Sequence, residues 1–195
     1  MNPLPTDAAG PGALRAPRFL TASLARELGI LLCLSVMFPF LIHVLPVPET
    51  ARLGAMLLPM FYAPLLAGLW GRKRSALAVA LLAPWLNWAL TSHPSPLGAI
   101  VMMVQLLVFV LTLRSLMLFI GARPFLAAPA YFLAMAASLA VTAAFPELGN
   151  GQSAFDSTVR SMAIGLPGIA ILVLLNWLAL QYYPPGSADG GPRMA

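Results

Sequence analysis

The chain has few charged residues. Only 9% of its 195 residues are Asp, Glu, Lys or Arg, whereas roughly 25% is typical of soluble domains. A single cysteine, Cys33, excludes a disulfide framework and a cysteine-rich metal site. The net charge is +5, yet there is one lysine and no basic helix face with interleaved aromatic residues, so nucleic-acid binding is not expected. With 60% hydrophobic residues and a mean hydropathy of +0.87, the composition predicts an integral membrane protein.

Catalytic motifs are also absent. The sequence has no Walker A phosphate-binding loop, no H-E-x-x-H zinc motif and no G-x-S-x-G nucleophile elbow. Its apolar segments contain no Asp or Glu, which argues against a proton-relay antiporter. His43 and His93 have no carboxylate or cysteine at ligand spacing, so capping or interfacial roles are favoured over metal binding. We therefore expect no enzyme activity, no metal site and no cofactor held by this chain.

Six apolar segments approach the roughly 20 residues that cross a bilayer as a helix. They are predicted at 28–45, 53–70, 75–92, 97–113, 124–145 and 159–183. The cationic stretch at 71–74 must be a tight turn outside the bilayer, since burying each charge would cost about 2.5–3.5 kcal/mol. The predicted fold is an all-α membrane domain of six transmembrane helices over 24–183. A flexible tail without signal-peptide features (1–23) and a disordered tail (184–195) flank it.

The cationic residues are concentrated in the two tails and in every second connection between these segments. Nine of the eleven belong to one group of connections: Arg15, Arg18, Arg26, Arg72, Lys73, Arg74, Arg114, Arg123 and Arg193. Only Arg52 and Arg160 lie in the other group. Because cations are retained on the cytoplasmic side of short membrane loops, both termini are predicted to be cytoplasmic. We expect a multi-pass protein of the cytoplasmic (inner) membrane.

Proline interrupts most of the predicted helices. Every segment except the fourth contains one: Pro39, Pro59 and Pro64, Pro84, Pro129, and Pro167. Proline is simply commoner in membrane helices than in soluble ones, but broken helices at membrane depth also line the binding cavities of transporters. With two prolines five residues apart, the segment 53–70 is not expected to be one straight helix.

Small residues recur at every fourth position on the segment 124–145, which is typical of close helix packing. They form two stripes: Ala130, Ala134 and Ser138, and Ala136, Ala140 and Ala144. Packing within the chain is the simplest interpretation for this segment. Ala25 and Gly29, on the cytoplasmic side, could instead contact a partner subunit.

Uncharged polar and aromatic residues gather in the outer half of the predicted domain. Asn87, Trp88 and Thr91 share a helix face by their spacing, and Trp85 adjoins it. The tryptophans also fit an interfacial belt, whereas an amide inside the bilayer should find a partner. Gln105 enters the fourth segment by about 12 Å. It forms either an interhelical hydrogen bond or a ligand contact.

The last outer loop is polar and contains glycine. It includes Asn150, Gln152 and Asp156, and it leads to Arg160. Such a loop could close over a small ligand, with Arg160 pairing either Asp156 or a ligand carboxylate. We therefore expect a pocket formed by Trp85, Asn87, Trp88, Thr91 and Gln105, with the loop as its lid.

Five stretches of the sequence are distinctive: GAMLLPMFYAPLLAGL at 54–69, ALLAP at 80–84, SHP at 92–94, VMMVQL at 101–106 and GLPGI at 165–169. Together they resemble the substrate-binding membrane subunit (S component) of energy-coupling factor (ECF) vitamin transporters. The resemblance covers about residues 28–180. It implies a six-helix subunit that captures a vitamin or similar micronutrient from the outer side. Gln105 stands where the family often has a glutamate.

The resemblance also implies partners. These are a coupling membrane subunit and ATPase subunits, which alone would bind ATP. Ala25 and Gly29 are the nearest equivalent of the family's docking pattern of small residues, and Arg72, Lys73 and Arg74 lie on the same predicted side. A six-span scaffold or assembly protein that binds no solute would show the same hydropathy and charge pattern, and it is the alternative interpretation.

Overall fold

A computed structural model describes residues 22–44, 53–149 and 153–182. Every regular element in these ranges is a helix. The elements are α1 (Ala22–Val44), α2 (Leu53–Leu57), η2 (Pro59–Phe61), α3 (Tyr62–Trp70), α4 (Lys73–Thr91), α5 (Pro96–Ile120), α6 (Ala127–Ala144), η3 (Pro146–Gly149), α7 (Ala154–Ile164) and α8 (Leu166–Tyr182). These helices overlap all six ranges that were predicted from the sequence.

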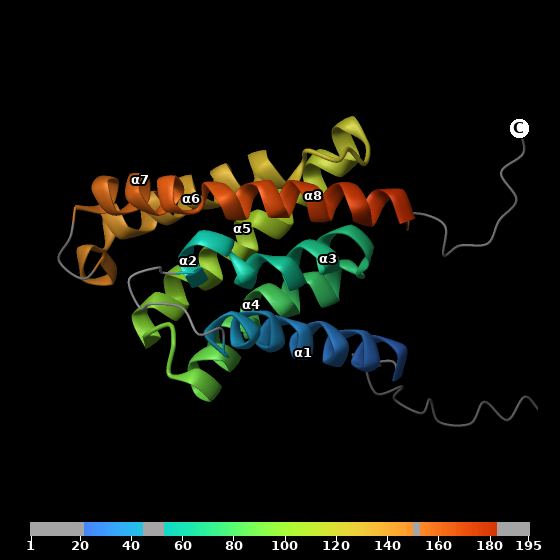
Figure 1. The fold of residues 1–195 in the computed structure, drawn as a ribbon, viewed down its shortest axis with the longest axis horizontal. Coiled ribbons are helices and arrows are strands. Elements are labelled where there is room, and N and C mark those ends of the chain that lie inside the picture. Colours follow the sequence, from blue (N-terminus) through green and yellow to red (C-terminus); the bar gives the residue numbers. More distant parts are fainter. Residues whose placement is uncertain (1–21, 45–52, 150–152, 183–195) are drawn as a thin grey trace, which may run out of the picture.

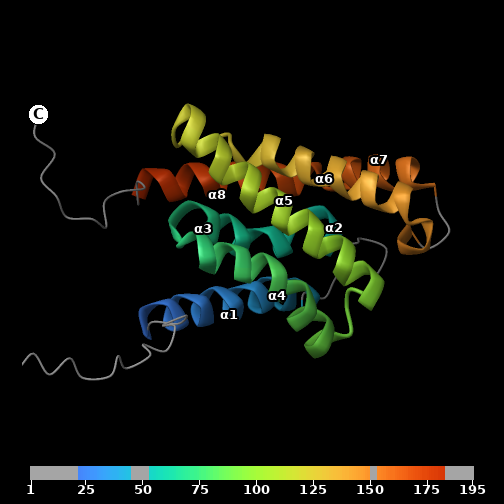
Figure 2. The ribbon, with the colours of Figure 1, turned by 180° about the vertical axis from the view of Figure 1, so that it is seen from behind.

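The long helices lie side by side, and their ends gather at two opposite ends of the molecule (Figures 1 and 2). The start of α1, the α3–α4 turn, the α5–α6 connection and the end of α8 share one end. Six of the seven described cations belong to this end: Arg26, Arg72, Lys73, Arg74, Arg114 and Arg123. We call it the cationic end. The α4–α5 and α6–α7 connections lie at the opposite end, with Arg160 on α7.

Three described helices are long and apolar enough to cross a membrane: α1, over Ala22–Ile42, α5 and α6. A fourth is added if α7 and α8, which are bent by 57° at their junction, form one span. This is fewer than the six that were predicted. The segment 53–70 is divided into pieces of at most nine residues, and α4 carries Lys73 and Arg74 in its first turn. The helices indicate a multi-pass membrane protein.

The prolines interrupt fewer helices than their number suggested. Pro39 and Pro84 lie inside α1 and α4, which continue through them. Pro64, Pro129 and Pro167 fall within the first three residues of α3, α6 and α8. The first N–H groups of a helix have no partner within it, so proline is tolerated there. The helical segments break before Pro59 and again at Gly165, next to Pro167.

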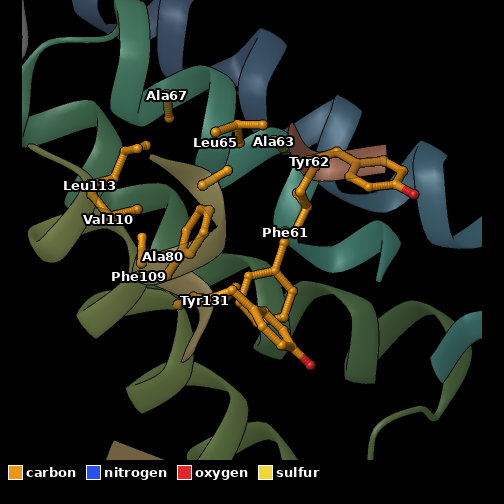
Figure 3. Close-up of a cluster of buried hydrophobic side chains, with 14 of the residues drawn as sticks. Phe61, Tyr62, Ala63, Leu65, Ala67, Ala80, Phe109, Val110, Leu113 and Tyr131 are labelled. Atoms are coloured by element: carbon orange, nitrogen blue, oxygen red, sulfur yellow. The ribbon is translucent and has the colours of Figure 1, made fainter. Parts of the chain in front are cut away.

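The broken segment 53–70 lies in the centre of the molecule, and Figure 3 shows buried side chains of this segment together with side chains of α4, α5 and α6 in the same cluster. The Phe61 ring makes edge contacts with Phe109 of α5 and Tyr131 of α6, at centroid distances of 5.2 Å each. Gly68 allows α3 to approach α5 closely, because a Cβ there would lie 2.8 Å from Cδ2 of Leu113. This packing sets the position of η2 relative to α5 and α6.

The two stripes of small residues on α6 face different surroundings. Ala130, Ala134 and Ser138 are buried, while Ala136, Ala140 and Ala144 are exposed. Only the first stripe is used for packing within the chain, and it includes the hydroxyl of Ser138, which becomes part of the cavity described next.

Candidate functional site

A hollow of about 240 Å³ opens between α5, α6 and α7 at the end opposite the cationic end. Hydroxyl groups are the main polar feature of its wall. Together with the Gln105 amide, the polar side chains lining it are Ser138, Thr142, Ser157, Thr158 and Ser161. No described Asp, Glu, Lys or Arg lines it. The hollow therefore offers hydrogen bonds without charge.

A second hollow of about 210 Å³ adjoins the first and has a different character. The two share Met102, Gln105, Met135 and Ser161. Elsewhere the second hollow is lined by the α2–η2 segment, which includes Phe61, and by Tyr131 of α6. Its wall is largely apolar. We refer to the two hollows together as the double cavity, because Gln105 lies on the wall of both.

Two interruptions between helices lie at this wall: Leu58 lines the second hollow, and Gly165 lies next to Leu58 without lining either hollow. Leu58 separates α2 from η2 and has a left-handed conformation, with φ 54° and ψ 42°. Gly165 separates α7 from α8. The breaks approach each other: a Cβ on Gly165 would lie 3.5 Å from Cδ2 of Leu58 and 3.0 Å from the Tyr131 hydroxyl. Discontinuous helices that meet at a cavity are typical of solute sites in transporters.

Gln105 is held in place by one half of its amide. Its Nε2 donates to Oγ of Ser138 at 2.9 Å and contacts the sulfur of Met135 at 3.6 Å. No described residue donates a hydrogen bond to its Oε1. The side chain thus forms the interhelical hydrogen bond that the sequence allowed, and the ligand contact stays a prediction.

Asn87 lies at a helix interface and does not line the double cavity. Its side chain is 1% exposed, and its Nδ2 donates to the backbone carbonyls of Ser35 on α1, at 3.0 Å, and of Ala83, at 2.9 Å. Asn87 and Gln105 were predicted from the sequence to line one pocket, whereas in the structure only Gln105 of the two lines the double cavity. The reason is that the Asn87 face of α4 packs against α1 instead of turning toward α6 and α7.

The other predicted residues of α4 also lie away from the double cavity. The rings of Trp85 and Trp88 form an edge contact at 6.1 Å, and Trp88 is 38% exposed. The Thr91 hydroxyl donates to the carbonyls of Asn87 and His93. These contacts are local to α4 and the turn that follows it. None of the three residues lines either hollow.

The predicted lid is only partly described. Asn150 and Gln152 lie outside the described residues. Asp156 and Arg160 are exposed on α7, and they line neither hollow. Helix α7 begins with a cap in which the Ser153 hydroxyl accepts a hydrogen bond from the backbone N–H of Asp156, at 3.4 Å. Four residues of α7 reach the hollow: Ala154 and the hydroxyl-bearing Ser157, Thr158 and Ser161.

The predicted docking residues lie on the surface. Ala25 and Gly29 are exposed on α1, and a Cβ on Gly29 would meet no atom within 4 Å. Arg72, Lys73 and Arg74 are exposed at the α3–α4 turn. Glu27 connects the two regions, because its Oε1 accepts a hydrogen bond from the backbone N–H of Arg72 at 2.9 Å.

The sequence reasoning missed the hydroxyl groups of the cavity. Ser138 and Thr142 are four residues apart on α6, and Ser157 and Ser161 have the same spacing on α7. Residues at this spacing share a helix face, so the two pairs were visible as hydroxyl stripes. Their convergence on Gln105 depends on how α5, α6 and α7 pack together.

Comparison with protein-family models, curated proteins and solved structures finds no match to this chain. Within the described ranges, no three His, Cys, Asp or Glu side chains are grouped so that they could hold a metal ion. The function is therefore argued from the double cavity and the charge distribution alone.

Proposed function

We propose that this chain is a solute-binding membrane subunit that captures a small uncharged molecule for uptake. The observation that carries the proposal is the double cavity, where an amide with a free acceptor, Gln105, stands between a hydroxyl-lined and an apolar hollow. Membrane cavities formed at helix breaks are the usual place for a transported solute. The chain itself catalyses no reaction and binds no cofactor in this proposal.

The proposed topology has six spans, formed by α1, the α2–η2–α3 segment, α4, α5, α6 and the bent α7–α8 pair. The cationic end lies in the cytoplasm, because Lys and Arg are retained on that side. Both termini are then cytoplasmic, and the double cavity belongs to the outer half of the cytoplasmic (inner) membrane. A solute would enter from outside, past α7 and the α6–α7 connection.

The lining favours an uncharged ligand with two unlike parts. A charged group in the hollows would lack a described counter-ion, and burying it would be costly. Hydroxyls of α6 and α7 would hydrogen-bond one part, while Phe61, Tyr131 and the methionines would contact a flat apolar part. Each hollow is smaller than the roughly 300–1,000 Å³ of small-molecule sites, and together they fall within that range. A heterocyclic, vitamin-like molecule fits this description.

The proposed partners follow the resemblance to ECF S components. A coupling membrane subunit would dock where Ala25 and Gly29 are exposed, close to the cations Arg72, Lys73 and Arg74. ATPase subunits would bind and hydrolyse ATP on the cytoplasmic side. The exposed small residues of α1 support this assignment, because they permit close approach of another helix.

The test is direct. The protein is purified in mild detergent, and the small molecules that it releases on denaturation are identified by mass spectrometry. The affinity for the released molecule is then measured for Gln105→Ala, with Gln181→Ala as a matched control, since Gln181 is exposed on α8 far from the cavity. We expect Gln105→Ala to weaken binding at least fivefold and the control to leave it unchanged. Equal affinities, or no released solute, would contradict the proposal and favour the scaffold alternative.

A further inference from the structure

A separate cavity of about 290 Å³ lies at the cationic end, between α3, α4 and α5. It is lined by Gly68, Leu69, Lys73, Arg114, Met117 and Leu118. Two cations and no described carboxylate contribute to its wall. This cavity shares no residue with the double cavity.

Arg114 is positioned in this wall by neutral groups. It is half-buried on α5, and its Nη1 donates to the carbonyls of Gly71 at 2.7 Å and Gly68 at 3.3 Å. Among the described residues, no partner is bonded to its Nη2 or Nε. The two carbonyls fix the direction of the guanidinium but do not neutralise it. A partly buried charge of this kind calls for an anion.

Lys73 adds a second positive charge to the same wall, and no ion pair joins it to a described residue. It opens α4, whose first turn contains no acidic residue and whose N-cap, Arg72, makes no side-chain cap hydrogen bond. The N-terminus of a helix already attracts anions, and the cations around it increase this attraction. The one described carboxylate at this end, Glu27, accepts the Arg72 backbone N–H from the α1 side.

The rest of the cavity is apolar and continuous with an exposed surface of α5. Leu118, on the cavity wall, is 86% exposed, and its neighbour Phe119 is 85% exposed. In a membrane such residues face acyl chains. A ligand that places an anionic group on Lys73 and Arg114 and hydrocarbon along Leu118 matches both halves of the site, whereas an acidic peptide would match only the charged half.

We propose that this cavity binds the phosphate of an anionic phospholipid, with Lys73 and Arg114 as its ligands and Leu118 against its acyl chain. Basic cavities between helices on the cytoplasmic side of membrane proteins are suited to such headgroups. The lipid would occupy the site whether or not a solute fills the double cavity.

The experiment measures which lipids the purified protein retains. The protein is equilibrated with equal amounts of phosphatidylglycerol and phosphatidylcholine in detergent, and bound lipids are counted by native mass spectrometry. Lys73→Gln is compared with the wild type and with Arg160→Gln, which removes one exposed cation at the opposite end. We expect Lys73→Gln to lower the preference for phosphatidylglycerol about fivefold, the factor typical of one cation near an anionic surface. Arg160→Gln should leave the preference unchanged.

Arg114→Gln should lower the preference for phosphatidylglycerol by a similar factor. This variant also loses the hydrogen bonds to Gly68 and Gly71 and could therefore fail to fold; in that case Lys73→Gln still tests the proposal. Wild-type preference in Lys73→Gln, or an equal loss in Arg160→Gln, would overturn the proposal. If Lys73→Gln keeps its lipids but no longer assembles with the coupling subunit, the cations serve protein docking and the lipid site is wrong.

Discussion

The contact between α2 and α8 at Gly168 gives the most direct prediction about how the cavity wall is held. A Cβ on Gly168 would lie 2.6 Å from the Met56 carbonyl oxygen, 2.7 Å from Cγ of Leu58 and 2.8 Å from the Leu57 carbonyl carbon. All three distances are shorter than van der Waals contact, and two of the atoms belong to the backbone. Gly168→Ala must therefore push α2 away from α8.

Overpacking of this kind costs about 1–3 kcal/mol. Alanine also favours a helix over glycine by about 0.5–1 kcal/mol, which would mask part of the loss. Gly29→Ala corrects for this gain, because the added Cβ meets no atom within 4 Å on α1. The difference in unfolding free energy between the two variants then isolates the clash.

Thermal unfolding in detergent, followed by tryptophan fluorescence, measures both variants. We expect Gly29→Ala to unfold at or slightly above the wild-type temperature and Gly168→Ala several degrees below it. Solute binding should weaken only in Gly168→Ala, because Leu58 lines the second hollow. Equal unfolding temperatures for the two variants would refute the argument that the α2–α8 contact is too tight for a methyl group.

Two further variants test the packing of the bundle. Phe61→Ala removes the ring between Phe109 and Tyr131, and it should destabilise the protein by about 3–5 kcal/mol; Phe125→Ala, at an exposed position, is the control and should have little effect in the same unfolding assay. Asn87→Ala removes the hydrogen bond to α1 and should lower stability by about 0.5–2 kcal/mol. Asn87→Ala should leave the solute affinity unchanged. If the variant is as stable as the wild type but binds solute more weakly, Asn87 belongs to the solute site after all.

The helical character and the approximate positions of the helices were readable from the sequence, because runs of apolar residues mark them. The cations mark helix ends less directly, since Arg114 lies inside α5, which continues to Ile120. The tight turn between α3 and α4 follows from the cationic stretch at 71–74. The six predicted spans stay a prediction, because three described helices, or four with the bent α7–α8 pair, are long and apolar enough to cross a membrane. The segment 53–70 is divided into short helices near its prolines, so none of them is long enough to cross a membrane alone. Hydropathy summed over the whole segment does not detect this division.

The candidate site was readable only in part. Asn87 and Gln105 are both single amides on apolar helices, and nothing local distinguishes them. Because these helices are apolar on nearly every side, the sequence does not show which face meets a neighbour. Gln105 faces Ser138 and the double cavity, whereas Asn87 faces the backbone of α1. That difference arises from how α4 and α5 pack against their neighbours.

Helix α5 connects the two ends of the molecule. It runs from Pro96 to Ile120 without a break, and it carries both Gln105 and Arg114. Their separation of nine positions corresponds to about 13–14 Å along the axis. Arg114 is bonded to the carbonyls of the α3–α4 turn. A partner that pulled on that turn at the cationic end would therefore move the same helix that forms part of the cavity wall. Force applied at one end of α5 would displace Gln105 near the other.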